Sequence, residues 1–306
     1  MMFQQPEALM IRKLVCVAIL SASVCALQAQ NPSETKPLSP NWEELTGPDF
    51  IQAIHQAQNV CVLPLGIIEK HGPHLPLGTD LLDVRFAVFN AVKQEYAVVF
   101  PEYYFGQIFE ARSQPGTVAY SLSTQLTLLQ ETVEEMARNG CSKIVIVNGH
   151  GGNNSLLPLF AQAQLASKRD YVVYVFGLPN THVAGRPAMK SDPNNDMHAG
   201  ETETSNMLIA RPDLVQMDKA DSQSGADQHR LNLPDNVYTG IWWYARFPNH
   251  YSGVGSAATK QLGEFDQKAW SSQIAEAIKS IKAYDESLKL QTEFFEKAQH
   301  PLETKQ

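Results

Sequence analysis

The sequence predicts an α/β fold in which helices cover both faces of a mainly parallel sheet. Short apolar runs typical of buried strands alternate with longer segments of helical periodicity along most of the 306 residues. Most of these runs are followed by glycine or polar residues, which is where parallel sheets end and where they place their chemistry. A hydrophobic content of 43% supports a sizeable core, and the length fits one large domain or two small ones.

The first element is a predicted targeting segment. Arg12 and Lys13 precede an apolar run from Leu14 to Leu27, and small or polar residues follow that run. This is the order of a secretory signal peptide, and the run is too short to span a bilayer comfortably. We therefore expect residues 1–29 to be removed, leaving an exported chain, periplasmic or secreted, with no stable membrane anchor.

The domain is expected to follow a polar, proline-containing linker at residues 30–42 and to occupy residues 43–300. Periodicity predicts helices at residues 41–58, 81–95, 123–140, from 153 onward, from 201 onward and from 263 past 289. Apolar runs predict strands at residues 60–65, 97–101, 144–147 and 171–176. Two long irregular segments, 179–200 and 218–259, exceed what a compact domain needs, so we expect site walls or oligomer contacts there.

Charge and cysteine content narrow the function classes. The formal net charge is −8 and the sequence pI is about 5.6, which argues against binding to nucleic acid or to an anionic membrane surface. Two of the four cysteines lie in the predicted signal, and Cys61 and Cys141 remain. We expect two buried free thiols. An exported compartment would permit a disulfide, but neighbouring parallel strands rarely hold one.

The most informative run extends from Glu69 to Asp80, directly after the predicted strand at 60–65. Glu69 and His71 are two residues apart, so both side chains project the same way if the backbone is extended. Carboxylates and imidazoles without thiolates are a ligand set for Zn²⁺, Mn²⁺ or Fe²⁺.

Three further segments join this run. They are the glycine-rich turn Asn148–Asn153, the acidic stretch His198–Ser205 and the weaker Gly253–Thr259. Each has an ordinary explanation by itself, such as a tight turn, a phosphate cradle or a solvated loop. Together they bring imidazoles and carboxylates to consecutive loops, in a number that suits two ions sharing one carboxylate.

These motifs resemble those of the creatininase (creatinine amidohydrolase) family. The resemblance rests on Glu-x-His-Gly-Pro-His-Leu-Pro-Leu-Gly-Thr-Asp at 69–80, Asn-Gly-His-Gly-Gly-Asn at 148–153 and His-Ala-Gly-x-x-Glu-Thr-Ser at 198–205. Pro115-Gly116-Thr117 and Gly253-Val254-Gly255 match weaker motifs, and the resemblance covers residues 43 to 285. It implies a three-layer α/β/α domain, assembly into a homo-oligomer, usually a hexamer, and metal-dependent hydrolysis of non-peptide C–N amide bonds.

The resemblance also implies a ligand set. Glu69 and His150 would bind one ion, His71 the other, and Asp80 would bridge both. A further Glu ligand of creatininase falls on Gly152 here, and the subgroup with Gly-Gly at this place implies Glu203 as the replacement. The aromatic position after the metal histidine is Gly151 here, which argues against creatinine as the substrate.

The expected reaction is hydrolysis of a cyclic or formamide-like amide with two divalent ions, Zn or Mn or both, with Fe as a further candidate. His198 would protonate the leaving nitrogen, and Glu203 would assist as a catalytic residue as well as a ligand. Predicted substrate-binding residues are Ser113, Thr117, Gly151 and Gly152. His74 is expected to be structural, and Trp242, Trp243 and Tyr244 form either an apolar wall of the site or an oligomer contact.

Two alternatives stay open. A lactonase or a deformylase would use the same ligand set, and a non-catalytic exported binding protein would keep the same fold. A serine hydrolase is disfavoured, because the Gly-x-Ser-x-Gly spacing of a nucleophile elbow is absent around Ser256.

Overall fold

A computed structural model describes residues 38–234 and 236–305. The predicted signal segment and the first part of the predicted linker lie outside the described residues. Among the described helices, none has the length and apolar character needed to cross a membrane.

Four parallel strands form the central sheet in the order β2-β1-β3-β4. They are β1 (Val60–Leu65), β2 (Val98–Val99), β3 (Lys143–Asn148) and β4 (Val172–Phe176). Every residue of β1 and β3 is buried, as the two apolar runs in the sequence predicted. Leu65 pairs with Asn148, so β1 and β3 end at the same level, and the loops that follow them lie at the same end of the sheet.

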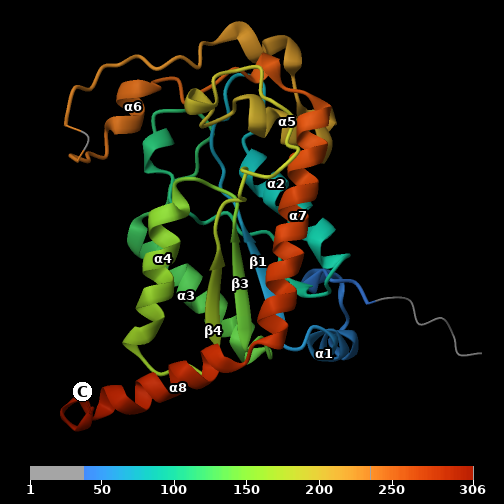
Figure 1. Ribbon diagram of the computed structural model, residues 1–306, viewed down its shortest axis with the longest axis vertical. Helices are drawn as coiled ribbons and strands as arrows, with labels where there is room; N and C mark the ends of the chain where they lie inside the picture. Colours follow the sequence, from blue (N-terminus) through green and yellow to red (C-terminus); the bar gives the residue numbers. More distant parts are fainter. Residues whose placement is uncertain (1–37, 235, 306) are drawn as a thin grey trace, which may run out of the picture. The chain divides into compact units, whose positions relative to one another are not determined.

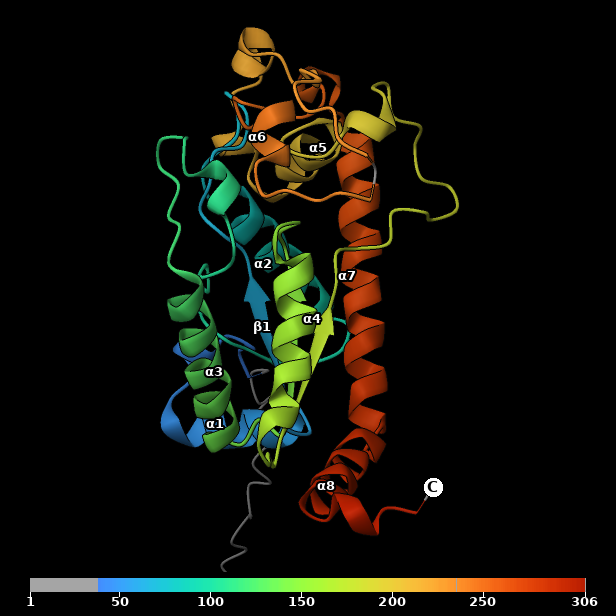
Figure 2. The same cartoon turned by 90° about the vertical axis from the view of Figure 1, so that its left-hand side faces the viewer.

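Helices cover both faces of this sheet, which confirms the predicted α/β class (Figure 1). They are α1 (Gly47–Gln56), α2 (Thr79–Val92), α3 (Leu122–Arg138), α4 (Asn153–Ala163), α5 (Glu201–Ala210), α6 (Trp242–Arg246), α7 (Lys260–Ala283) and α8 (Glu286–Gln299). One face packs on α1, α3 and α4 through a cluster that includes Leu63, Met136 and Leu157. The other face packs on α2 and α7 (Figure 2). Val62 and Trp270 belong to the apolar cluster on this face.

Local sequence signals explain where several helices begin and end. The Thr46, Ser121 and Thr259 hydroxyls each accept a hydrogen bond from a backbone N–H in the first turn of α1, α3 and α7. Gly140 follows α3 with φ of +100°, a conformation that glycine adopts without strain.

Two predicted helices are each divided in the structure. The segment predicted as a helix at 41–58 contains a short 3₁₀ turn, Trp42–Glu44, and then α1, because Thr46 and Pro48 start a new helix. The last predicted helix is α7 followed by α8. Lys143 explains this break, since its ammonium donates to the carbonyls of Ile281 and Lys282 at the end of α7.

The domain also begins earlier than residue 43. The Val99 N–H donates to the carbonyl of Pro40 at 2.7 Å, and the Tyr96 hydroxyl donates to the carbonyl of Ser39. Leu38 packs against the core cluster of the same face. Residues 38–42 therefore belong to the domain rather than to a free linker.

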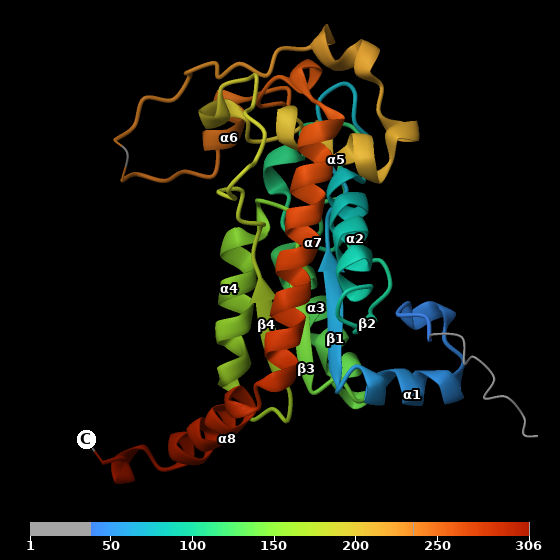
Figure 3. The same ribbon diagram turned by 45° about the vertical axis from the view of Figure 1, so that its right-hand side comes forward.

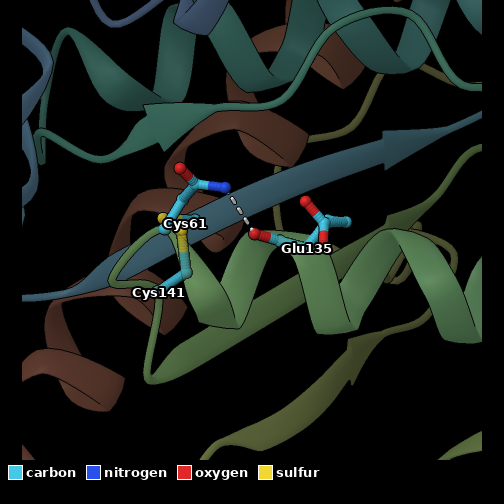
Figure 4. Close-up of a disulfide and its surroundings, with 4 residues drawn as sticks. Cys61, Glu135 and Cys141 are labelled. Atoms are coloured by element: carbon cyan, nitrogen blue, oxygen red, sulfur yellow. Dashed lines mark hydrogen bonds between the residues drawn. A yellow bond between two sulfur atoms is a disulfide. The ribbon is translucent and has the colours of Figure 1, made fainter. Parts of the chain in front are cut away.

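The expectation of two free thiols is wrong. Cys61 and Cys141 form a disulfide with a Cα–Cα distance of 5.6 Å (Figure 4). Cys61 lies in β1 opposite Ile144, but Cys141 precedes β3 and lies in the turn after α3. The bond therefore joins a strand to a turn, not two adjacent strands, at the amino ends of β1 and β3.

Candidate active site

The predicted ligands converge beyond the carboxyl ends of β1 and β3, at the end of the sheet where α2, α4 and α5 begin (Figure 3). Glu69 and His71 lie in the loop after β1, and Asp80 lies in the first turn of α2. His150 follows β3, and Glu203 lies in the first turn of α5. These side chains are buried, apart from the Glu203 side chain, which is 30% exposed.

Asp80 is the centre of the cluster. Its Oδ2 lies 2.9 Å from His150 Nδ1, which is also 3.1 Å from Glu69 Oε1. Its Oδ1 lies 3.1 Å from His71 Nε2, which is 3.9 Å from Glu203 Oε2. Three groups of mutually close ligand atoms result among the described residues. Two of them, Glu69–Asp80–His150 and His71–Asp80–Glu203, share Asp80, and the third is Glu69–His71–His198.

Two local features orient these ligands. The Nδ1–H of His71 donates to the carbonyl of Glu69 at 3.2 Å, so Nε2 faces Asp80. A Cβ at Gly152 would lie 2.4 Å from His150 Nε2, so a larger residue would displace that ring. The position of the His150 ring therefore requires glycine at position 152.

The cluster fits divalent metal ions. Glu69 Oε1 and Asp80 Oδ2 are buried, and both lie within 3.1 Å of the same nitrogen, His150 Nδ1, without a well-directed hydrogen bond to it. Burying a carboxylate without full hydrogen bonding is costly, and a coordinated cation removes that cost. Oxygen and imidazole donors without sulfur suit Zn²⁺, Mn²⁺ or Fe²⁺.

The charged groups of the cluster strongly shift one another's pKa values. Burial opposes ionisation of Glu69 and Asp80, but the surrounding histidines hold the pKa of each below its usual value. Burial likewise opposes the charge on His71, yet Asp80 and Glu69 raise its pKa to about 10. Burial, together with Asp80, raises the pKa of Glu203 to about 7. Because ligands must lose protons to coordinate, metal binding here releases protons.

His198 lies against this cluster in a neutral form. Its ring centroid is 4.3 Å from that of His71, and its Nε2–H donates to the carbonyl of Lys70 at 2.8 Å. Burial and the neighbouring His71 lower its pKa to about 3. Nδ1, 3.9 Å from Glu203 Oε2, is the nitrogen left for chemistry. Its role as proton donor stays a prediction.

His74 lies outside these ligand groups. The Thr204 hydroxyl donates to the carbonyl of Ala199 at 3.2 Å, so it accepts from His74 Nε2–H at 2.8 Å. This bond ties the loop after β1 to α5, in keeping with the structural role expected for His74.

Sequence reasoning missed His250 and did not pair it with Trp243. His250 Nε2 contacts Glu69 Oε2, and the Trp243 indole N–H donates to His250 Nδ1 at 2.7 Å. Because an indole N–H can only donate, Nδ1 must be the acceptor, and Nε2 carries the proton given to Glu69. The available signal was position, since His250 lies three residues before the Gly253-Val254-Gly255 motif.

A cavity of about 390 Å³ opens onto Glu69 and His150. Gly151, Gly152, Trp242 and Trp243 line it, so these aromatic residues form a wall of the site, whereas Tyr244 and Ser113 line an adjoining cavity. Thr117 lines neither of these two cavities, and its hydroxyl oxygen is buried without a hydrogen-bond partner among the described residues. His198 and Glu203 line a third cavity of about 600 Å³.

The fold and the site together define an α/β protein with a buried carboxylate–imidazole cluster of the kind that holds divalent metal ions. Comparison with known proteins gives the family. The chain belongs to the creatininase family, because the family model described as creatinine amidohydrolase matches residues 43–278.

Individual relatives agree with this assignment. The chain is 34% identical over 180 residues to the mycofactocin precursor peptide peptidase of Mycolicibacterium smegmatis, covering 56% of this chain and 66% of that protein, just under two thirds. It is 26% identical over 191 residues to the creatinine amidohydrolase of Pseudomonas putida, covering 58% of this chain and 74% of that protein.

Solved creatininase structures share the fold. A crystal structure of creatinine amidohydrolase superposes with a TM-score of 0.64 at 24% identity, covering 78% of this chain and 96% of that one. A structure described as creatininase Mn gives a TM-score of 0.63 at 23% identity, covering 79% and 98%. These similarities confirm the layered α/β architecture.

Proposed function

We propose that this protein hydrolyses an amide C–N bond with the help of two divalent metal ions. The observation that carries the proposal is the position of Asp80, whose two oxygens face different imidazoles, each accompanied by a second carboxylate. Relatives named creatinine amidohydrolase and mycofactocin precursor peptide peptidase support amide hydrolysis as the reaction class.

The ions would be Zn²⁺ or Mn²⁺ or both, with Fe²⁺ as a further candidate. Glu69, Asp80 and His150 would hold one, and His71, Asp80 and Glu203 the other. Structural neighbours described as Zn-Zn type and as Mn creatininases support this choice of metals. When bound, such ions polarise a carbonyl oxygen and lower the pKa of water.

The chain's own residues would then position groups and move protons. With its Nε2–H engaged by the carbonyl of Lys70, His198 has Nδ1 free to accept a proton and pass it to the leaving nitrogen. Glu203, in the same neighbourhood, would assist that transfer. Trp243 fixes the tautomer of His250, and His250 in turn orients Glu69.

The substrate we propose is a cyclic or formamide-like amide bound against Gly151 and Gly152, with Ser113 further out. A formamide substrate is favoured by a 27% identical relative named 2-amino-5-formylamino-6-ribosylaminopyrimidin-4(3H)-one 5'-monophosphate deformylase, from Methanothermus fervidus. A lactone would need the same activated water. A purely binding role is disfavoured, because every predicted ligand position is retained.

We also propose that the chain is exported and acts as a homo-oligomer. The Cys61–Cys141 disulfide supports export, since such bonds persist mainly in oxidising compartments. Western blotting of cell fractions for the protein, and sedimentation of the purified chain, would test the two statements. A protein retained in the cytoplasm would contradict export, and a monomer would contradict assembly.

Metal analysis of the purified chain, combined with turnover of a panel of cyclic amides, formamides and lactones, tests the proposed reaction. We expect near two ions per chain and release of an amine or ammonia. Glu203→Gln should lower the metal content to near one ion, whereas the neighbouring Glu201→Gln should not, because the Glu201 carboxylate already accepts from the backbone N–H groups of Lys190 and Ser191. A folded chain that binds no metal would contradict the proposal.

A further inference from the structure

The cavity beside Glu69 and His150 does not end at the candidate site. A second cavity, about 720 Å³, adjoins it, and the two have several lining residues in common. The shared residues are Gln107, Glu110, Gly152, Ser155, Tyr238 and Gly240. Because one set of residues lines both, the two cavities adjoin, and we call the second one the outer chamber.

The outer chamber differs from the site in chemistry. Its remaining walls are mostly large apolar side chains, namely Phe109, Leu122, Leu156, Leu159, Ile241 and Tyr244. Leu159 is 62% exposed and Ile241 is 55% exposed. Clustered exposure of large apolar side chains on a soluble protein marks a surface that binds something apolar.

The junction between the two spaces is polar and held in place. Gln107 donates from Nε2 to Glu110 at 3.0 Å and accepts the Phe109 N–H at 2.7 Å. The Gln107 N–H donates to Asn153 Oδ1 at 2.9 Å, which ties this loop to the first turn of α4. The Glu110 carboxylate can accept the N–H of an amide that passes from the site into the chamber.

Because the chamber adjoins the site cavity, a group attached to the reacting amide can reach it. Resting on the proposed function, we propose that the hydrolysed amide carries a bulky apolar substituent, aromatic or branched aliphatic, that occupies the outer chamber. Cavities of about 300–1,000 Å³ accommodate drug-sized ligands, far larger than a small cyclic amide. The substrate class is therefore a secondary amide with a hydrophobic group on its nitrogen.

The test is a matched series of N-methylformamide, N-benzylformamide and N-(2-naphthylmethyl)formamide, assayed with the metal-loaded full chain by formate release. We expect kcat/KM to rise at least about tenfold from the methyl to the larger compounds, equivalent to about 1.4 kcal/mol. Ile241→Glu places a charge in the chamber and should reduce the benzyl-to-methyl ratio to near one. Ile51→Glu, at a 61% exposed position on α1, is the matched control and should keep the ratio of the wild type.

A binding measurement separates failure of this proposal from failure of the proposed function. Calorimetric titration of N-benzylformamide into the metal-loaded chain should give heat with the wild type and none with Ile241→Glu. Binding of this kind without hydrolysis of any amide would support the chamber and contradict the proposed reaction. Hydrolysis with equal kcat/KM for all three formamides would support the reaction and overturn the chamber. Dissociation of an oligomer by Ile241→Glu with an unchanged ratio would identify a second copy as the occupant and also overturn it.

Discussion

The two ends of the sheet meet opposite requirements. Beyond the carboxyl ends of the strands, the carboxylates of Glu69 and Asp80 are buried against each other's histidine partners, with one imidazole nitrogen, His150 Nδ1, between them. At the amino ends, Cys61 and Cys141 are covalently joined and belong to a large apolar cluster. The same strands thus carry an electrostatically costly end and a cross-linked end.

This difference suggests how the fold tolerates the candidate site. In a metal-free chain the charge of these buried carboxylates is compensated, among the described residues, only by the surrounding histidines, and a bound cation would compensate it further. The disulfide stabilises the chain whether or not a cation is bound, because it constrains the unfolded state. Substitutions at the carboxyl end should therefore reduce activity, and substitutions at the amino end should reduce stability.

The largest expected effect is at the carboxyl end. Asp80→Asn removes the carboxylate that two of the ligand groups share, and we expect a loss of activity of at least about 10³-fold together with loss of bound metal. Circular dichroism should show an unchanged fold. Asp170→Asn, at an exposed carboxylate before β4, serves as the control. An Asp80→Asn chain that keeps both metal and turnover would rule out the shared-ligand role.

A change at the amino end should lower stability and leave activity nearly unchanged. The double variant Cys61→Ser with Cys141→Ser should lose about 2–4 kcal/mol of unfolding free energy in guanidinium titrations, with turnover at 25 °C within about twofold of the wild type. Peptide mapping without reductant should recover the two cysteines in one cross-linked fragment. Equal stability of the variant and the wild type would mean that the disulfide does not stabilise the fold.

A smaller effect is expected from removing the hydrogen bond that Trp243 donates to His250, the residue that contacts Glu69. Trp243→Phe keeps an aromatic ring in place but removes the donor that fixes the His250 tautomer, so we expect about a 10-fold fall in kcat or in metal affinity. The neighbouring Trp242→Phe is the control, because it changes the cavity wall without touching His250. Similar losses in both variants would assign the effect to the wall.

The smallest effect concerns acid stability. Burial and His71 lower the pKa of His74 to about 4, below the 6.5 of an unperturbed histidine. Between these values the unfolded chain binds the additional proton, so His74 makes stability fall as the pH decreases from about 6.5 toward 4. In denaturant titrations at pH 7 and pH 5, His74→Gln should lose less stability on acidification than the wild type. An equal loss in both would contradict this account, and His300→Gln is the exposed control.

Much of the fold could be predicted from the sequence, because buried strands appear as apolar runs and half-buried helices as a periodic pattern. The strands β1 and β3 are wholly buried, so their apolar runs were unmistakable. The strand β2 is harder, since only Val98 and Val99 pair with β1 and the predicted run at 97–101 is longer. The break between α7 and α8 was not predictable, because it depends on Lys143, far away in the sequence.

The candidate site was readable to the extent that its residues follow strands or begin helices. Glu69, His71, Asp80, His150 and Glu203 are all of this kind, but their assignment to two ions came from the family resemblance. His250 contacts Glu69 across 181 residues of sequence from a long loop without periodicity, so no local pattern reveals it. The disulfide was not predicted for a similar reason, because a turn rather than a strand brings Cys141 to Cys61.

The disulfide also makes a closed covalent ring of the chain between residues 61 and 141. Glu69, His71 and Asp80 lie inside this ring, while His150 and Glu203 lie outside it. A protease that cuts once in the loop between β2 and α3 would therefore open the ring without dividing the molecule. Both pieces would migrate as one species until a reductant separates them, so the ring keeps the ligand-bearing segment attached to the rest of the site after backbone cleavage.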